Sequence, residues 1–391
     1  SLMSMIQALG FTLGMGSGNY LSRVLGSRDE EKAERIASTG FYSAILIGLL
    51  FAVVCLPNLD VLVRLLGATD TIAPYAKDYA KYILIAAPVM TGSLAMNNLL
   101  RFQGLAVYAM IGITTGGILN MILDPIFIFG LGMGVKGAAL ATIISQAVSC
   151  SWVLTFLTGK KTFLRIKKEY LKPVPSIVFP CLALGLSTFV MQSSESVISV
   201  CFNSSLLKYG GDLAVGAMTI LTSTMQFAML PLQGIGQGAQ PIMSYNYGAR
   251  NIDRMKKTFK LHLVISLIYS TLFWFFVQLF PATFAGIFSS DPELVSFTAG
   301  ALRIYCGAMF LFGIQLACQM TFVAIGYAVC SIIVAVVRKF VLLLPFVPMF
   351  VSNKTMGVYM AEPIADAIAV TFTAILFSIQ FRKALRKLEK A

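Results

Sequence analysis

Residues 116–146, GGILNMILDPIFIFGLGMGVKGAALATIISQ, decide the fold, because they predict two membrane-spanning helices joined by a glycine-rich turn. Asn120 and Asp124 are four residues apart and therefore share one helix face. Pro125 follows directly and is expected to kink or loosen that helix. Thr142 lies as far beyond the turn as Asp124 lies before it, roughly 10 Å inside one membrane surface. The stretch therefore predicts an amide, a carboxylate and a hydroxyl that converge between neighbouring helices.

A carboxylate at that depth costs roughly 2.5–3.5 kcal/mol on insertion scales, which makes Asp124 a functional candidate. The alternative is that Asp124 only caps or kinks the helix beside Pro125. The convergence of Asn120 and Thr142 on it favours a role in cation coupling. Na⁺ prefers several oxygen ligands, whereas a proton needs one suitable carboxylate. The sequence permits either ion.

The composition indicates a polytopic membrane protein. Of the 391 residues 57% are hydrophobic and only 12% are charged, with a mean hydropathy of +0.81, whereas soluble domains carry about 25% charged residues. Apolar runs of about 20 residues, enough to cross a bilayer, recur along the chain. The predicted spans are 5–22, 39–59, 80–100, 106–130, 137–158, 177–204, 214–240, 260–280, 297–323, 329–350 and 356–380.

The basic residues indicate topology rather than nucleic-acid binding. Most of the Lys and Arg fall in segments 22–36, 160–172, 249–260 and 382–390, which lie on alternate loops. The positive-inside rule makes these loops, and the C-terminus, cytoplasmic. The segment 160–172 alternatively binds anionic lipid. The last segment is either a helix on the membrane surface or a solvated charged tail.

Several chemistries are excluded by what the chain lacks. The seven Cys have no metal-ligand spacing, so we expect small buried hydrophobes without disulfides or zinc. No Gly-Lys-Ser/Thr motif follows a glycine turn, so no ATP site is expected. The single His262 opens a span and is expected at the membrane interface. We therefore expect neither an enzyme nor a cofactor.

An internal repeat is visible at an offset of 222 residues. Several Gly, Ser and basic residues of the first 32 positions recur there, and further glycines match near the same offset. The pairs are Gly14 and Gly236, Gly16 and Gly238, Ser22 and Ser244, Gly26 and Gly248, Arg28 and Arg250, Lys32 and Arg254, Gly92 and Gly313, Gly104 and Gly326, and Gly134 and Gly357.

The repeat predicts two parallel six-helix lobes, because its copies lie six spans apart. The span 177–204 opens the second lobe, and its partner would precede residue 1, so we expect twelve spans in the intact protein and eleven here. The expected division is an N-lobe at 1–159, a cytoplasmic linker at 160–176 and a C-lobe with its basic tail at 177–391.

Other intramembrane polar residues have two interpretations each. Gln192 and Glu195 lie deep in the span 177–204, where Glu195 either attracts a cationic substrate or is a structural buried acid. Glu362 and Asp366 share a face of the last span. Arg338 and Lys339 lie mid-span on the helix before it, so a structural ion pair is favoured over a transport role for Asp366.

These signatures resemble the multidrug and toxic compound extrusion (MATE) family and, within it, the MepA-like bacterial branch. The resemblance covers the whole chain. It rests on the paired glycine turns, on R101-F-Q-G104, on the run from Asn120 to Thr142 and on G357-V-Y-M-A-E-P-I-A-D366.

The resemblance implies a cation-coupled antiporter that exports amphipathic or cationic organic compounds by alternating access. Some members hold the cation on an Asn and an Asp four apart, a Thr on the next helix and an Asp on the first helix. Asn120, Asp124 and Thr142 match three of these positions, and with Na⁺ they would be metal ligands. Other members use acids on the first and fourth helices of the second lobe, but the span 297–323 has none.

The expected partners are drugs or toxic metabolites, H⁺ or Na⁺, and the lipid of a bacterial inner membrane, with no nucleic acid and a monomeric state. The first rival is a flippase for lipid-linked precursors, which would need an anion-binding cavity lined with Arg and Lys. Only Arg338 and Lys339 lie mid-span, which argues against it. An intramembrane enzyme or a channel fits the pattern less well, since no nucleophile is clustered with His262 and repeated lobes suit alternating access.

Overall fold

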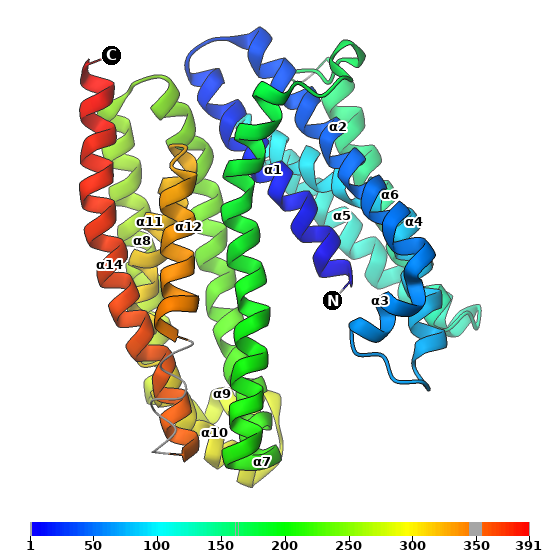
Figure 1. Cartoon of the computed structure of the whole chain (residues 1–391), viewed down its shortest axis with the longest axis vertical. Helices are drawn as coiled ribbons and strands as arrows, with labels where there is room; N and C mark the ends of the chain where they lie inside the picture. Colours follow the sequence, from blue (N-terminus) through cyan, green and yellow to red (C-terminus); the bar gives the residue numbers. More distant parts are fainter. Residues whose placement is uncertain (1, 161, 163, 344–353, 391) are drawn as a thin grey trace. The chain divides into compact units, whose positions relative to one another are not determined.

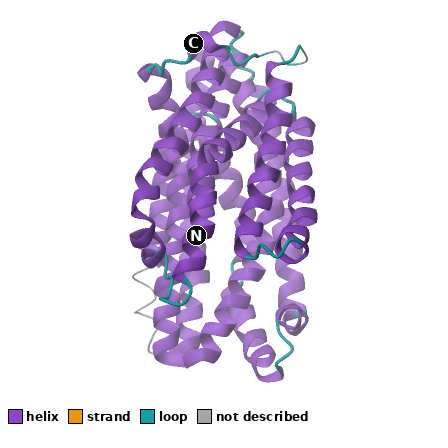
Figure 2. Ribbon diagram, turned by 90° about the vertical axis from the view of Figure 1, so that its right-hand side faces the viewer, coloured by secondary structure: helices purple, strands orange, loops and turns teal. Residues whose placement is uncertain are grey.

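The computed structural model describes residues 2–160, 162, 164–343 and 354–390, except the side chains of Gln192, Glu195, Ser196 and residues 341–343. Every regular element in this described part is a helix (Figure 2). The predicted all-α membrane fold is therefore confirmed. Contacts divide the chain into two compact units, residues 1–189 and 190–391.

The first unit is built around one buried helix, α4 (Ala73–Phe102), which packs against four neighbours (Figure 1). In its most apolar stretch 78% of the residues are buried, because Ala, Gly, Ser and Asn let other helices approach closely. The other elements are α1 (Leu2–Gly26), α2 (Glu30–Cys55), η1 (Leu56–Asn58), α3 (Leu59–Leu65), α5 (Ala106–Pro125), η2 (Ile126–Gly130), α6 (Val135–Thr158), η3 (Lys168–Tyr170) and the start of α7 (Pro175–Gly248).

The second unit begins within α7, which is broken at Gly211, where φ is +63°. Phe202 and Leu206 before the break and Ala214 and Met218 after it join the same core. The remaining elements are α8 (Ile252–Leu279), α9 (Pro281–Phe288), α10 (Pro292–Tyr305), η4 (Met309–Leu311), α11 (Phe312–Ala324), α12 (Ala328–Val336), η5 (Val337–Leu343) and α14 (Lys354–Lys390) (Figure 1).

The beginning of α7 belongs to the first unit because its backbone touches α1. A Cβ at Gly16 would overlap the carbonyl group of Cys181, and a Cβ at Gly185 would overlap that of Thr12. Two glycines therefore hold these helices at backbone distance. This contact places the division at residue 189, inside α7; the expected lobe boundaries stay a prediction.

The 222-residue repeat is present in the backbone. Helices α1 and α7 end at Gly26 and Gly248, and α5 and α12 begin at Ala106 and Ala328. Gly104 and Gly326 both have φ of +87°. Each member of these pairs is 222 residues from the other.

The turns before α2 and α8 match as closely. Arg28 and Arg250 have φ of +63° and +56°, a left-handed conformation uncommon for residues other than glycine. The next residues cap the helices: Asp29 accepts from the Lys32 amide at 3.1 Å, and Asn251 accepts from the Arg254 amide at 3.1 Å. The two units thus repeat local geometry as well as helix order.

The count of spans stays a prediction. Seven helices in the described ranges are long and apolar enough to cross a membrane, or eight if a bent pair is one span. That pair, Pro292–Tyr305 and Met309–Ala324, bends by 46° within the predicted span 297–323. The predicted span 329–350 extends past the described residues.

The basic tail is not a separate surface helix. Helix α14 continues without a break to Lys390, and Phe381, Ala384 and Leu385 in its last turns are buried. The expectation of a helix lying in the membrane plane is therefore wrong, because this apolar face packs on the unit's own core.

We expect Gly16→Ala to destabilise the protein, because the added methyl group would force the Cys181 carbonyl away. Overpacking of this kind costs about 1–3 kcal/mol. Its repeat equivalent, Gly238, has no atom within 4 Å of a built Cβ, so Gly238→Ala is the matched control. Thermal unfolding in detergent should show a lowered midpoint for Gly16→Ala and an unchanged or higher one for Gly238→Ala. Equal midpoints would contradict the close contact.

Candidate functional site

Helices α5 and α6 approach closely because small residues face one another. A Cβ at Gly116 would lie 3.1 Å from Cβ of Ser149, and one at Gly112 would lie 3.0 Å from Cγ2 of Val153. In lipid, such contacts hold helices together where the hydrophobic effect does not. The glycines continue at four-residue spacing into Asn120, so the close approach leads directly into the polar part of the pair.

The predicted polar cluster is present between these helices. The amide nitrogen of Asn120 lies 3.4 Å from Oδ1 of Asp124 and 3.5 Å from Oγ1 of Thr142. The Thr142 hydroxyl donates to the Ala138 carbonyl at 3.0 Å. All three side chains are half-buried. Asn120 thus bridges the two helices, with contacts near the upper limit of a hydrogen bond.

The backbone changes character directly after Asp124. Pro125 lacks the N–H of a continuous helix, and Ile126–Gly130 form a π-helical turn. Such turns are frequent at functional sites. Gly132 and Gly134, with φ of +64° and +58°, then reverse the chain into α6. The expected disturbance at Pro125 therefore takes the form of a wider helical turn.

Tyr79 on α4 is a member of this cluster that sequence reasoning missed. Its hydroxyl forms a side-chain hydrogen bond with Thr142, and its ring lies within electrostatic range of Asp124. An ion pair of 3.5 Å between Asp78 and Lys136 also joins α4 to α6. No periodicity marks Tyr79, since its place depends on how α4 packs against the helix pair.

The cluster offers oxygen atoms and one negative charge. Asp124 supplies a carboxylate, Thr142 and Tyr79 supply hydroxyls, and Asn120 supplies an amide that can present either its oxygen or its nitrogen. No group of three or more His, Cys, Asp and Glu gathers within the described ranges. A single carboxylate among neutral oxygens suits a proton or a monovalent hard cation better than a multivalent one.

The predicted cavity residues Gln192 and Glu195 lie on α7, and their side chains are outside the described ones. His262 is 3% exposed, so it is buried between helices rather than interfacial as expected. It lies near Gly236 on α7, where the position of a built Cβ is 3.6 Å from Nε2 of His262.

The second unit buries a cluster of four charged side chains. Nε of Arg338 lies 2.7 Å from Oδ1 of Asp366 and one terminal nitrogen lies 3.8 Å from Oε1 of Glu362. Nζ of Lys339 lies 3.6 Å from the same Glu362 oxygen. The side chains are at most 13% exposed. The Arg338 guanidinium also covers the Phe312 ring, 5.0 Å from its centroid.

The repeat relates this charge cluster to the first one. Arg338 and Lys339 are 222 residues from Gly116 and Gly117, and α12 and α14 correspond to α5 and α6. The same helix pair therefore carries buried polar groups in both units. In the first unit glycine lets the helices touch, whereas in the second arginine and lysine fill that place and supply their own positive charge.

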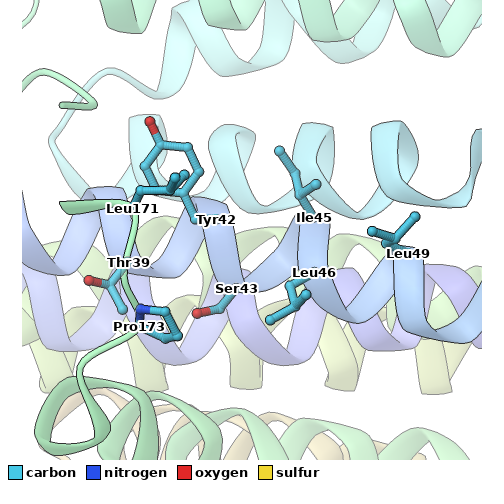
Figure 3. A pocket seen from close by; sticks show the side chains of 8 residues that line it. All are labelled: Thr39, Tyr42, Ser43, Ile45, Leu46, Leu49, Leu171 and Pro173. Carbon is cyan, nitrogen blue, oxygen red and sulfur yellow. The ribbon is translucent and has the colours of Figure 1, made fainter. Parts of the chain in front are cut away.

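The cavity in Figure 3 is separate from both clusters. It measures about 340 Å³ and lies between α2 and the segment before α7. Its wall carries three hydroxyls, on Thr39, Tyr42 and Ser43, and no charged side chain. The Lys167 amide donates to Ser38 at 3.0 Å beside it. Nothing in this wall resembles a coupling site.

Known proteins resemble this chain in sequence. The MatE family model matches residues 1–126 and 187–349. The multidrug export protein MepA of Staphylococcus haemolyticus is 29% identical over 313 residues, which are 80% of this chain and 69% of that protein. MepA of Staphylococcus saprophyticus is 26% identical over 356 residues, 91% of this chain and 78% of that protein.

Solved structures match over nearly the whole chain. The crystal structure of MATE in complex with MaL6 superposes with a TM-score of 0.91 at 26% identity, covering 99% of this chain and 86% of that one. An outward-facing multidrug resistance MATE family transporter of the MOP superfamily gives 0.90 at 27% identity with the same coverage. With its helices, its repeat and the matched family model, the chain belongs to the MatE family.

Proposed function

We propose that this protein exports small amphipathic or cationic organic compounds across a bacterial cell membrane, driven by inward movement of H⁺ or Na⁺. The observation that carries the proposal is the Asn120–Asp124–Thr142 cluster with Tyr79, set between α4, α5 and α6 in a chain of the MatE family. The printed names of the relatives, multidrug export proteins, support the substrate class. We further propose a monomer with a cytoplasmic C-terminus.

The proposed mechanism is differential binding. A cation on Asp124 cancels its negative charge, and this changes the hydrogen bonds that Asp124 makes with Asn120 across the α5–α6 pair. One conformation of the transporter then binds the cation better and another binds the drug better. Such a difference in affinity is what couples two ligands. Transport, and not catalysis, is the activity that this cluster supports.

The rival function, a flippase for lipid-linked precursors, is not proposed. It requires free positive charge for an anionic headgroup. The two buried cations of the second unit, Arg338 and Lys339, both face Glu362, and Arg338 also binds Asp366. We propose that this cluster is structural.

Asp124→Asn should lose gradient-driven transport, because the amide keeps the size of the side chain but binds neither H⁺ nor Na⁺. We expect a loss of about tenfold or more in the rate of dye movement in everted vesicles, equivalent to about 1.4 kcal/mol. A pH step and a Na⁺ step applied separately identify the ion. Asp70→Asn, which removes an exposed acid of a surface ion pair with Arg64, should transport normally. Normal transport by Asp124→Asn would exclude this site.

Tyr79→Phe should weaken the response to the coupling ion without abolishing transport. The change removes one hydroxyl and keeps the ring, so it deletes the contact with Thr142. Losing one hydrogen bond of about 0.5–1.5 kcal/mol raises the half-saturating ion concentration about two- to tenfold. Tyr75→Phe, a change on an exposed residue of the same helix, is the control. An unchanged half-saturation in Tyr79→Phe would remove Tyr79 from the site.

Asp366→Asn should strongly destabilise the protein, because Arg338 loses its nearest carboxylate. Breaking a buried pair costs about 3–5 kcal/mol. The double variant Arg338→Gln/Asp366→Asn leaves no unpaired charge at these two positions and should recover much of the unfolding midpoint and the transport activity. If the double variant is stable but does not transport, the cluster has a transport role and is not only structural.

A further inference from the structure

The end of α14 borders an open groove that the proposed transport function does not use. The groove measures about 1180 Å³. It is lined by Tyr327, in the turn before α12, and by side chains of α14 between Ser378 and Lys390. Five of these are basic: Arg382, Lys383, Arg386, Lys387 and Lys390.

The helix that carries these charges is held firmly by its opposite face. Phe377 and Phe381 stack at 4.9 Å, and the Phe259 ring on α8 lies 4.6 Å from Phe377. Ala384 and Leu385 are buried in the same core. The basic side chains therefore project from a fixed helix, with the spacing of successive turns, and not from a mobile tail.

The positive charge of the groove is not neutralised by the protein. All five basic side chains are exposed, and none forms an ion pair in the described part of the chain. Glu389 is the only acid between Ile379 and Lys390. A concentration of this kind is costly unless anions from outside the chain balance it.

We infer that this groove binds the headgroup of an anionic phospholipid. Its charge complements a phosphodiester, and clusters of four to eight Lys and Arg directly beside a membrane helix attract anionic lipid by about 1 kcal/mol per residue. Arg382 and Lys383 directly follow the apolar span, at the level where a headgroup lies. The inference requires that α14 crosses the membrane, and it does not depend on drug export or on Asp124.

The apolar rim favours a lipid over a free phosphate ion. Ile379 is 60% exposed at the end of the groove nearest the span, where it can contact an acyl chain. Tyr327 adds an aromatic ring of the kind enriched at membrane interfaces. The long stems of Lys and Arg can cover apolar surface while their charged ends reach the phosphate. A groove of this size holds a headgroup and part of its chains.

Native mass spectrometry of the whole purified protein tests the inference, with phosphatidylglycerol and phosphatidylcholine as probes. We expect phosphatidylglycerol to bind about tenfold more tightly than phosphatidylcholine. The variant Lys383→Gln/Arg386→Gln/Lys387→Gln should lose about tenfold in affinity for phosphatidylglycerol. The charge-preserving variant Lys383→Arg/Arg386→Lys/Lys387→Arg should keep the wild-type affinity.

The matched control removes three other exposed charges of the same unit, Lys256, Lys257 and Lys260 on α8. These residues do not line the groove, so this variant should retain most of the affinity. An equal loss would show general attraction of a basic surface and overturn the inference. Equal binding of the two lipids would also overturn it, as would full displacement of phosphatidylglycerol by inorganic phosphate, which would indicate a free-anion site. Circular dichroism of each variant checks that the fold is intact.

Discussion

The close contact between α5 and α6 is the interaction on which the candidate site depends. In a bilayer the tails of the lipids are as apolar as leucine, so helices associate through packing and polar contacts. Gly112 and Gly116 bring the α5 backbone within reach of Ser145 and Ser149. This distance lets one amide, on Asn120, reach partners on both helices. A wider spacing would leave two separate polar side chains, and no shared site would exist.

The part of the site that sequence predicts is the part governed by local geometry. A separation of four residues places Asn120 and Asp124 on one face, and a short turn makes the next helix the neighbour, which brings Thr142 close. Tyr79 could not be found in this way, because it joins from α4, a helix whose packing against the pair is a tertiary property. Arg338 and Asp366 were paired because isolated charges in a membrane are costly.

The same distinction applies to the fold. Apolar length predicts the helices, and repeated glycines predict the duplication, which the matching left-handed turns at Arg28 and Arg250 then show in detail. Breaks inside continuous apolar sequence were not predicted. The chain bends between Tyr305 and Met309, where hydropathy does not change. The end of α14 was also misjudged, since its basic residues hide the apolar face that includes Phe381 and Leu385.

The two helix pairs have a different relation to membrane voltage. In the second unit two acids and two bases share one buried cluster, so their formal charges cancel and an electric field exerts almost no net force on it. Asp124 has no such built-in partner among Asn120, Thr142 and Tyr79. A unit charge that crosses the membrane gains or loses about 2.3 kcal/mol per 100 mV. The sensitivity of the transport cycle to the membrane potential therefore resides in the first unit, and the second unit can move without electrical work.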